Sequence, residues 1–292
     1  MLFRSGQIDR VGVGTSDWQK KLEEGNKYDK VMVSEPTTSY VFFNTKNKYF
    51  SNTKIRQAFS MGFDKNDYVK IVGHGIGKAA FSWTPPSLMI GNDEFRAKVP
   101  EQLKAVKADP KKLLIEGLKE IGADPDPAKM NISYLEAGTD EGSKETGDFF
   151  INVFKAKLGI NLKVNYMEWA QANDEIIKGN YDMSAQAWGG DYNDPMTFFD
   201  MFQTNAGVVT NFWSNKKYDA LINDAKGTMD EAKRLEDFKQ AESMLLIDQA
   251  VIAPLWYKQY PVFSEKFIKG VQAPMFAPVQ VEWKYAYTVG RK

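Results

Sequence analysis

The strongest constraint on the fold of this chain is a regular alternation of helical and strand patterns between about residues 108 and 195. Residues 109–122 begin with Asp-Pro, carry apolar side chains near helical spacing and end in glycine, as an amphipathic helix does. After this helix we expect strand 130–137, helix 146–159, strand 160–168, helix 172–180 and strand 181–188. Strict succession of helix and strand predicts an α/β fold whose parallel strands are joined by right-handed crossovers.

The polar segment AWGGDYNDP, residues 187–195, begins where the last of these strands ends. In open α/β sheets, ligands bind beyond the carboxyl ends of the strands. The segment places two carboxylates, Asp191 and Asp194, beside a tryptophan and two glycines at such an end. The same composition is typical of a surface turn, because Gly, Asp, Asn and Pro are turn residues. From the residues alone, a ligand loop and a plain turn both remain open.

Helical and strand patterns continue on both sides of this region. We expect strand 39–47, a long helical pattern over 52–72, helices 217–226 and 230–250, and strand 251–263 interrupted by Pro254 and Pro261. The charge-rich stretch 230–240 is expected to be a solvated helix face with opposite-charge pairs. The first 35 and last 30 residues form shorter or broken pieces that make no domain by themselves.

Composition excludes several classes of function. Lys+Arg and Asp+Glu each number 38, so no net positive charge favours nucleic acid, and we expect no nucleic-acid partner. The chain has no Cys and one His, His74, which excludes thiolate sites and multi-His zinc sites, and we expect no metal and no cofactor. No apolar run approaches the roughly 20 residues of a membrane span, and the first residues lack the apolar region of a signal peptide. The protein is therefore cytoplasmic, or its export signal is not in this sequence.

The segment GHGIG, residues 73–77, superficially resembles a phosphate-binding loop. It lacks the Lys-Ser/Thr of a P-loop and the strand-turn-helix context of a dinucleotide-binding fingerprint. We therefore expect an ordinary loop in which His74 is no ligand.

Several phrases taken together resemble the solute-binding proteins of oligopeptide ABC transporters. They lie in family order along essentially the whole chain: FRSGQID (3–9), SYVFFNTKN (39–47), NTKIRQAFSMGFDKNDYV (52–69), SWTPPSL (82–88), the block 168–202 and APLWY (253–257). The most specific part is WGGDYNDP within the block. Family members are usually far longer, with an FxxGxxD-like phrase near mid-chain, so this sequence resembles the C-terminal portion of such a receptor.

The resemblance implies a periplasmic-binding-protein-like type II fold, in which two α/β lobes close around a peptide. Residues 37–259 are then expected to form a nearly complete second, peptide-binding lobe. Residues 1–36 would be a remnant of the first lobe, and residues 260–292 a C-terminal return to it. Hinge strands are expected near 39–44 and 255–260. The implied partners are oligopeptides, the membrane permease of an ABC transporter and the missing N-terminal portion of the chain itself.

The resemblance also implies a set of ligand-binding residues. These are Asp191, Trp188, Trp169, Gly189, Gly190 and Tyr192. Asp191 falls on the family position that binds the peptide ammonium, a charge-assisted contact of about 1.5–3 kcal/mol in a closed cleft. Trp188 and Trp169 fall on positions that contribute aromatic pockets, although each is also explained as a packing residue. Gly189 and Gly190 leave the backbone open to close approach by the ligand.

Three positions depart from the family pattern. Some members carry an Arg three residues before the loop tryptophan, and further basic residues on the preceding helix, which receive the carboxylate of peptides of defined length. Here those positions hold Ala185, Ile176 and Ile177. We therefore expect longer peptides whose C-terminus no fixed cation holds. Asp194 and Asn193 are expected to be capping or turn residues.

These observations predict a binding protein without catalytic residues of its own. It would be the extracytoplasmic oligopeptide-binding component of an ABC importer, a cell-surface lipoprotein in full-length form whose signal and lipidated Cys are not in this chain. Relatives within the family bind dipeptides, signalling peptides, nickel complexes or haem, and a lone His is a poor start for nickel. An alternative from another class is a hydrolase using Asp191 and Asp194, but no nucleophile lies nearby in the sequence.

Overall fold

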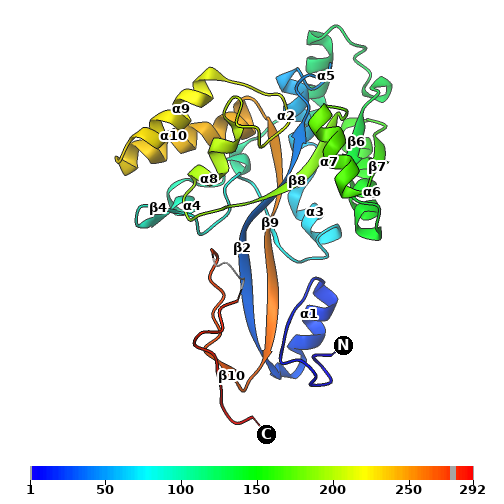
Figure 1. The fold of residues 1–292 in the computed structure, drawn as a ribbon. Coiled ribbons are helices and arrows are strands. Elements are labelled where there is room, and N and C mark those ends of the chain that lie inside the picture. Colours follow the sequence, from blue (N-terminus) through cyan, green and yellow to red (C-terminus); the bar gives the residue numbers. More distant parts are fainter. Residues whose placement is uncertain (1, 277–280, 292) are drawn as a thin grey trace.

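The structure, a computed structural model, describes residues 2–276 and 281–291, so Met1, 277–280 and Lys292 lie outside the described residues. Its main element is a mixed sheet in the order β1-β9-β2-β8-β6-β7, with β3 paired to β9 (Figure 1). The strands of this sheet are β1 (Arg10–Gly12), β2 (Tyr28–Phe43), β3 (Lys78–Ala79), β6 (Ser133–Glu136), β7 (Lys163–Tyr166), β8 (Met183–Gly189) and β9 (Ile252–Glu265). Two small pairs are β4 (Met89–Ile90) with β5 (Asp93–Glu94), and β10 (Ile268–Lys269) with β11 (Tyr287–Thr288).

Helices gather around one end of the long strands β2 and β9 (Figure 1). They are α2 (Thr53–Met61), α3 (Lys65–Ile71), α4 (Phe95–Lys98), α5 (Pro110–Glu120), α6 (Glu141–Leu158), α7 (Trp169–Lys178), α8 (Met196–Phe199), α9 (Lys216–Gly227) and α10 (Glu231–Ser243), which continues as the π-helix Met244–Asp248. Short 3₁₀ turns are Glu24–Asn26, Gln102–Ala105, Pro127–Lys129 and Asp200–Phe202. At the other end of the long strands lie α1 (Ser16–Glu23), β1 and the β10–β11 pair.

The predicted alternation of helix and strand is confirmed. Helix α5, β6, α6, β7, α7 and β8 follow one another, and β6 pairs in parallel with both β7 and β8. The helix ends follow local chemistry: Asp109 accepts hydrogen bonds from two backbone N–H groups at the start of α5, while Gly159 and Gly179 end α6 and α7 at φ of 80° and 81°. Helix α6 begins earlier than predicted because Asp140 caps it.

Two predictions for the flanking regions are wrong in detail. The helical pattern 52–72 is divided into α2 and α3, because Asp64 accepts the N–H groups of Asn66 and Asp67 and starts a new helix. Strand β9 is not interrupted by its prolines. Pro261 pairs with Met32, and Pro254 lies beside a register shift in the β2–β9 ladder, where the missing N–H is tolerated.

Side chains of β2 alternate between two large apolar clusters. Tyr40 and Phe42 belong to the cluster that contains α8, α9 and α10, whereas Val41 and Phe43 belong to the cluster with α2, α5 and α6. This half of the strand is therefore buried on both faces. A third, small cluster lies at the other end of the long strands and comprises Phe3, Val13, Leu22, Tyr28 and Phe263. Within the described residues, no helix is both long enough and apolar enough to cross a bilayer.

Candidate functional site

The loop that follows β8 is fixed from two sides. On one side, the backbone N–H of Gly190 donates to the carbonyl of Pro36 in β2 at 2.7 Å. On the other side, Thr197 at the start of α8 accepts two hydrogen bonds: its carbonyl from the Trp188 indole at 2.7 Å, and its hydroxyl from the Asp191 backbone N–H at 3.1 Å. These contacts hold Asp191 at the carboxyl end of β8, where the sequence places it.

The two carboxylates of the loop have different surroundings. Asp194 accepts the backbone N–H of Met196, two residues later, at 2.9 Å, which is the turn alternative of its predicted capping or turn role. It also pairs with Arg234 at 2.9 and 3.0 Å. Asp191 is exposed, and its carboxylate has no hydrogen-bond or ion-pair partner among the described residues. Of the two, only the Asp191 carboxylate is available to an incoming cation.

A cavity of about 480 Å³ lies between β6, β8 and α7, and we name it the tryptophan cavity. It is lined by Tyr40, Glu136, Ala137, Trp169, Asn173, Ile176, Ala185, Gln186, Ala187, Trp188, Met201 and Val208. Trp188 also packs against the apolar cluster around Tyr40, which confirms its predicted packing role. Trp169 starts α7 with 69% of its surface exposed, which contradicts the packing explanation for this residue. The fold thus brings the two predicted tryptophans to one hollow.

Tyr192 lies outside the tryptophan cavity. It is exposed and lines a different hollow of about 510 Å³, together with Asp194, Met196 and Arg234. Asn193 turns away as well, because its side chain accepts the backbone N–H of Met89 at 2.9 Å. The loop therefore presents only its first residues toward the tryptophans.

Glu136, which sequence reasoning missed, borders the tryptophan cavity, but its carboxylate lies on the opposite face of the sheet, where Tyr134 packs in the cluster with α6. Glu136 is the last residue of β6, the strand next to β8 in the sheet. Its Oε2 accepts a hydrogen bond from the Tyr134 hydroxyl at 2.6 Å. Burial raises the pKa of Glu136, and the hydrogen bond from Tyr134 opposes this change. The signal was present in the sequence, since 130–137 was predicted as a strand of the same parallel unit and its carboxyl end falls at this residue.

The two glycines of the loop are not equivalent. A Cβ on Gly190 would lie 2.9 Å from Phe198 Cε2 and 3.1 Å from Thr197 Cγ2, so close packing against α8 requires glycine there. A Cβ on Gly189 would meet only the Thr37 hydroxyl, at 3.3 Å. Gly190 is thus a packing residue of the loop, in addition to its predicted role in ligand approach.

Substituting these glycines one at a time gives a matched pair of variants. We expect Gly190→Ala to lower the free energy of unfolding by about 1–3 kcal/mol, because α8 or the loop must move to admit the methyl group. Gly189→Ala is expected to change it by less than about 0.5 kcal/mol. Urea denaturation of both variants measures the difference. Equal stabilities of the two variants would show that α8 does not pack on Gly190.

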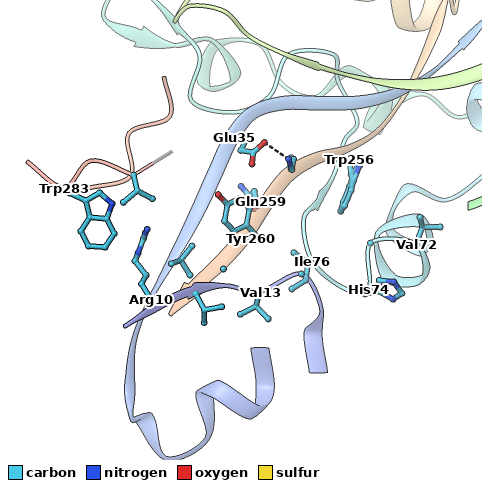
Figure 2. Close-up of a pocket in the computed structure, with 17 residues that line it drawn as sticks. Arg10, Val13, Glu35, Val72, His74, Ile76, Trp256, Gln259, Tyr260 and Trp283 are labelled. Atoms are coloured by element: carbon cyan, nitrogen blue, oxygen red, sulfur yellow. Dashed lines mark ion pairs between the residues drawn. The ribbon is translucent and has the colours of Figure 1, made fainter. Parts of the chain in front are cut away.

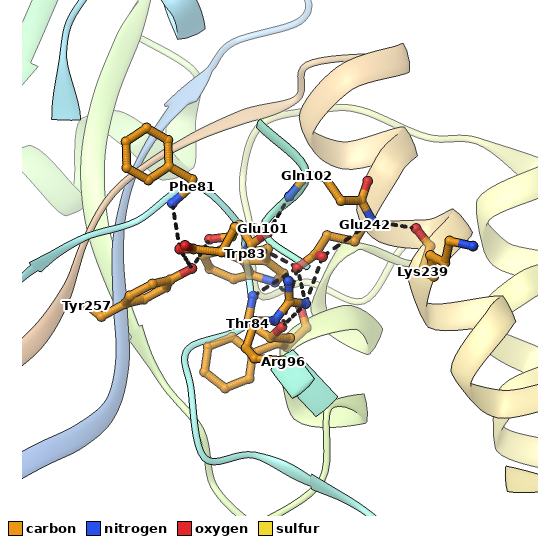
Figure 3. Close-up of polar contacts among 11 residues, drawn as sticks. Phe81, Trp83, Thr84, Arg96, Glu101, Gln102, Lys239, Glu242 and Tyr257 are labelled. Carbon is orange, nitrogen blue, oxygen red and sulfur yellow. Dashed lines mark hydrogen bonds and ion pairs between the residues drawn. The ribbon is translucent and has the colours of Figure 1, made fainter. Parts of the chain in front are cut away.

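A buried polar network centred on Glu242 helps to fix the position of α8 (Figure 3). The Glu242 carboxylate is 0% exposed and accepts hydrogen bonds from the backbone N–H groups of Trp83 and Thr84 at 3.0 and 3.2 Å. Arg96, with 7% of its side chain exposed, donates to the same carboxylate at 2.8 and 2.7 Å. The Trp83 indole in turn donates to the Phe198 carbonyl. Glu242 therefore positions the tryptophan that holds α8.

A larger cavity, of about 700 Å³, lies between β1, β9, the loop after α3 and Trp283 (Figure 2). Its carboxylate, Glu35, forms an ion pair with Lys258 at 2.9 Å, and no residue of the predicted site lines it. Of the GHGIG glycines, Gly73 borders this cavity. A Cβ on Gly73 or Gly77 would meet the Trp256 ring at 3.0 or 2.5 Å. Packing against that indole explains the glycine spacing without a phosphate ligand.

Comparison with known proteins shows which family the chain matches. Residues 1–209 match the middle region of the bacterial extracellular solute-binding proteins, family 5. The chain belongs to this family. The resemblance found in the sequence is thereby confirmed, and members of family 5 are solute-binding proteins.

Three similar proteins show how much of this chain, and of each relative, the match covers. The dipeptide-binding protein DppE of Bacillus subtilis is 28% identical over 284 residues, 97% of this chain and 51% of that protein. A substrate-binding domain of an oligopeptide ABC transporter from Bacillus anthracis superposes with a TM-score of 0.79 at 25% identity, covering 98% of this chain and 56% of its own. OppA of Listeria monocytogenes, bound to peptide, also has a TM-score of 0.79, at 26% identity over 99% of this chain and 55% of its own.

These superpositions confirm the periplasmic-binding-protein-like type II fold. The chain spans about half the length of the relatives it matches. The roles of Asp191 and the two tryptophans in ligand binding stay predictions.

Proposed function

We propose that this chain is the peptide-binding lobe of an oligopeptide receptor that serves an ABC importer, and that Asp191 binds the N-terminal ammonium of the peptide. The observation that carries this proposal is an exposed carboxylate without a cation partner, held by backbone contacts at a strand end beside an aromatic-walled cavity. Backbone and ammonium groups are shared by all peptides, so such a site accepts many sequences. The named activities of the relatives, dipeptide and oligopeptide binding, support the same class of ligand.

The charges near Asp191 favour the binding of a cationic group at this residue. Burial raises the pKa of Asp200, Lys226 lowers it, and the neighbouring charge of Asp191 raises it further. Asp194 is already neutralised by Arg234, so the uncompensated negative charge of the loop is concentrated at Asp191. An ammonium group placed there gains a charge-assisted hydrogen bond.

The absence of a cation from the tryptophan cavity favours oligopeptides over dipeptides. None of the residues that line it is Lys, Arg or His. A dipeptide has its carboxylate only two residues from its ammonium, and a fixed cation near Asp191 would be needed to receive it. We therefore infer that the C-terminus of the peptide extends beyond this cavity. Signalling peptides fit the same reasoning, whereas nickel complexes and haem find no ligand set here, since the described residues contain no group of three potential metal ligands.

The rest of the receptor would supply the opposite wall of the site. Residues 37–259 contain the two large apolar clusters, and the small third cluster is built from residues before 37 and after 259. This division supports a second lobe in 37–259 and two pieces of a first lobe in 1–36 and 260–292. Closure of the two lobes on hinge strands β2 and β9 would exclude water from the bound peptide. The corresponding whole protein would be an extracytoplasmic lipoprotein that delivers peptide to a membrane permease.

Catalysis by the Asp191 and Asp194 pair is disfavoured by the ion pair with Arg234. Both oxygens of the Asp194 carboxylate accept hydrogen bonds from Arg234, at 2.9 and 3.0 Å, so this carboxylate is engaged within the fold and does not face a substrate together with Asp191. We infer a binding protein that is not an enzyme.

Incubation with a mixed peptide pool tests this function. The chain is equilibrated with the pool, separated by ultrafiltration, and the retained peptides are identified by mass spectrometry. We expect intact peptides with free N-termini to be retained over their acetylated forms. Retention of no peptide would contradict peptide binding, and shortened peptides would point to the hydrolase.

A further inference from the structure

We propose that the cavity of about 700 Å³ beside β1, which we name the hinge cavity, binds a carboxylate of the peptide, and that Arg10 receives it. This inference rests on the proposed peptide-binding function and adds a second charged contact to it. The carboxylate can belong to an acidic side chain or to the C-terminus of the peptide, and the choice of peptides separates these two sources.

The side chain of Arg10 lies on the face of the sheet that lines the hinge cavity (Figure 2). A Cβ on Gly12, two residues later in β1, would meet the Tyr260 ring at 3.4 Å, so Gly12 and Arg10 both face the side on which Tyr260 lies. The guanidinium carbon of Arg10 is 5.9 Å from the centre of the Trp283 ring. Both aromatic side chains line the cavity, and the guanidinium therefore belongs to its wall.

Arg10 is the charged group of this wall that no described residue neutralises. Glu35 pairs with Lys258 at 2.9 Å, and the His74 imidazole lies 3.2 Å from a carboxylate of α6 outside the cavity. Within the part of the chain that the structure describes, Arg10 has no hydrogen-bond or ion-pair partner. The hinge cavity therefore keeps one positive charge that a bound anionic group would neutralise.

The surroundings of Arg10 favour a strong contact with a carboxylate. Burial lowers the pKa of Arg10, and Tyr260 opposes this change, as expected for a cation that is partly removed from water. An ion pair in such a place is screened less than one on the open surface, and a guanidinium can bind a carboxylate through two parallel hydrogen bonds. Because Arg10 already packs against Trp283, its side chain loses less freedom on binding.

The size and the walls of the hinge cavity suit a peptide side chain or terminus. At about 700 Å³ it holds such a group together with waters, each of which occupies roughly 30 Å³ in the liquid. Trp256 and Tyr260 provide apolar surface for methylene groups. A basic side chain would be repelled by Arg10, and a neutral one would leave the partly buried guanidinium unpaired. The cavity thus discriminates by charge.

The hinge cavity and the Asp191 loop adjoin the same segment of β2. The carbonyl of Pro36 accepts the Gly190 N–H, and Glu35, the residue before it, lines the cavity. An extended pentapeptide is about 16 Å long, at roughly 3.3 Å per residue. We therefore expect a peptide that starts at Asp191 to reach Arg10 with one of its later residues.

A peptide panel tests this contact. Alanine pentapeptides with a free N-terminus and an amidated C-terminus carry a single glutamate, or its uncharged analogue glutamine, at each position in turn, and dissociation constants are measured by calorimetry. A further pair compares the alanine pentapeptide with a free and with an amidated C-terminus. In one of these comparisons we expect the anionic peptide to bind about tenfold more tightly. A glutamate preference at one position identifies a side chain as the source, and a preference for the free C-terminus identifies the terminus.

Three variants assign the effect to Arg10. Arg10→Met should bring the dissociation constants of the anionic peptide and its neutral partner within about twofold of each other, whereas Arg10→Lys should keep a preference of at least about threefold. Arg4→Met removes the same charge from an exposed turn outside the cavity and should retain the full preference. Circular dichroism verifies that each variant is folded.

Equal binding of every anionic peptide and its neutral partner, or an unchanged preference in Arg10→Met, would overturn this inference and leave the proposed function standing. Failure of every peptide to bind would overturn both.

Discussion

Glu242→Ala is expected to lower the free energy of unfolding by about 3–5 kcal/mol, the largest loss from any single change in the buried polar network. The substitution removes the acceptor of two backbone N–H groups and leaves the Arg96 guanidinium buried without its counter-charge. Arg96 already has two nitrogens, Nε and Nη1, without partners in the structure, and its other acceptor, the Thr84 hydroxyl, carries no charge. Chemical denaturation followed by circular dichroism measures the loss.

A matched control lies on the same helix. Glu236 pairs with Lys239 at 3.3 Å on the exposed face of α10, and Glu236→Ala should change stability by less than about 0.5 kcal/mol. The double variant Arg96→Met with Glu242→Met should recover much of the loss, because a buried ion pair is replaceable by apolar side chains. If Glu242→Ala is no less stable than Glu236→Ala, the network does not support α8 as described.

Asp191→Ala is expected to weaken peptide binding by about 1.5–3 kcal/mol, or roughly 10- to 100-fold in the dissociation constant. The reason is that the variant keeps the loop contacts, which use the Asp191 backbone, and loses only the carboxylate. Because that carboxylate has no hydrogen-bond or ion-pair partner among the described residues, stability should change by less than about 0.5 kcal/mol. Calorimetric titration with a free-ended pentapeptide measures the affinity.

Asp174→Ala serves as the control for Asp191→Ala. It removes one exposed carboxylate from α7 and therefore reproduces any general effect of net charge on binding. An equal loss of affinity in both variants would show that Asp191 acts through long-range charge alone.

The helices and strands that could be predicted from the sequence are those whose own residues show a helix end, an apolar face or an alternation. Helices α6 and α7 have a glycine at the end and an apolar face, and β7 alternates along its length. The first half of β2 has no such signal. Its residues 28–36, YDKVMVSEP, mix apolar and charged side chains without regular alternation, and they become a strand by pairing with β9 more than 220 residues later in the chain, for example Val33 with Tyr260.

The same distinction holds for the site. Asp191 and the tryptophans were predicted as ligand-binding residues because the block 168–202 carries the family resemblance. Arg234 was missed because it lies 40 residues beyond its partner Asp194, within a helix whose charges were expected to face solvent. That expectation holds for Glu236 and Lys239, which pair at 3.3 Å with exposed side chains, and fails for Arg234, which turns to the loop. When the ion-pair partner lies on a distant helix or strand, the spacing of the two residues in the sequence does not predict the contact.

The ammonium contact at Asp191 is tested by a calorimetric cycle with two peptides and two proteins. One peptide has a free N-terminus, the other is acetylated, and each is titrated into the wild-type chain and into Asp191→Ala. We expect acetylation to weaken binding to the wild-type chain roughly 10- to 100-fold and to leave binding to the variant nearly unchanged. An equal effect of acetylation on both proteins, or no peptide binding to the wild-type chain, would contradict recognition of the peptide through Asp191.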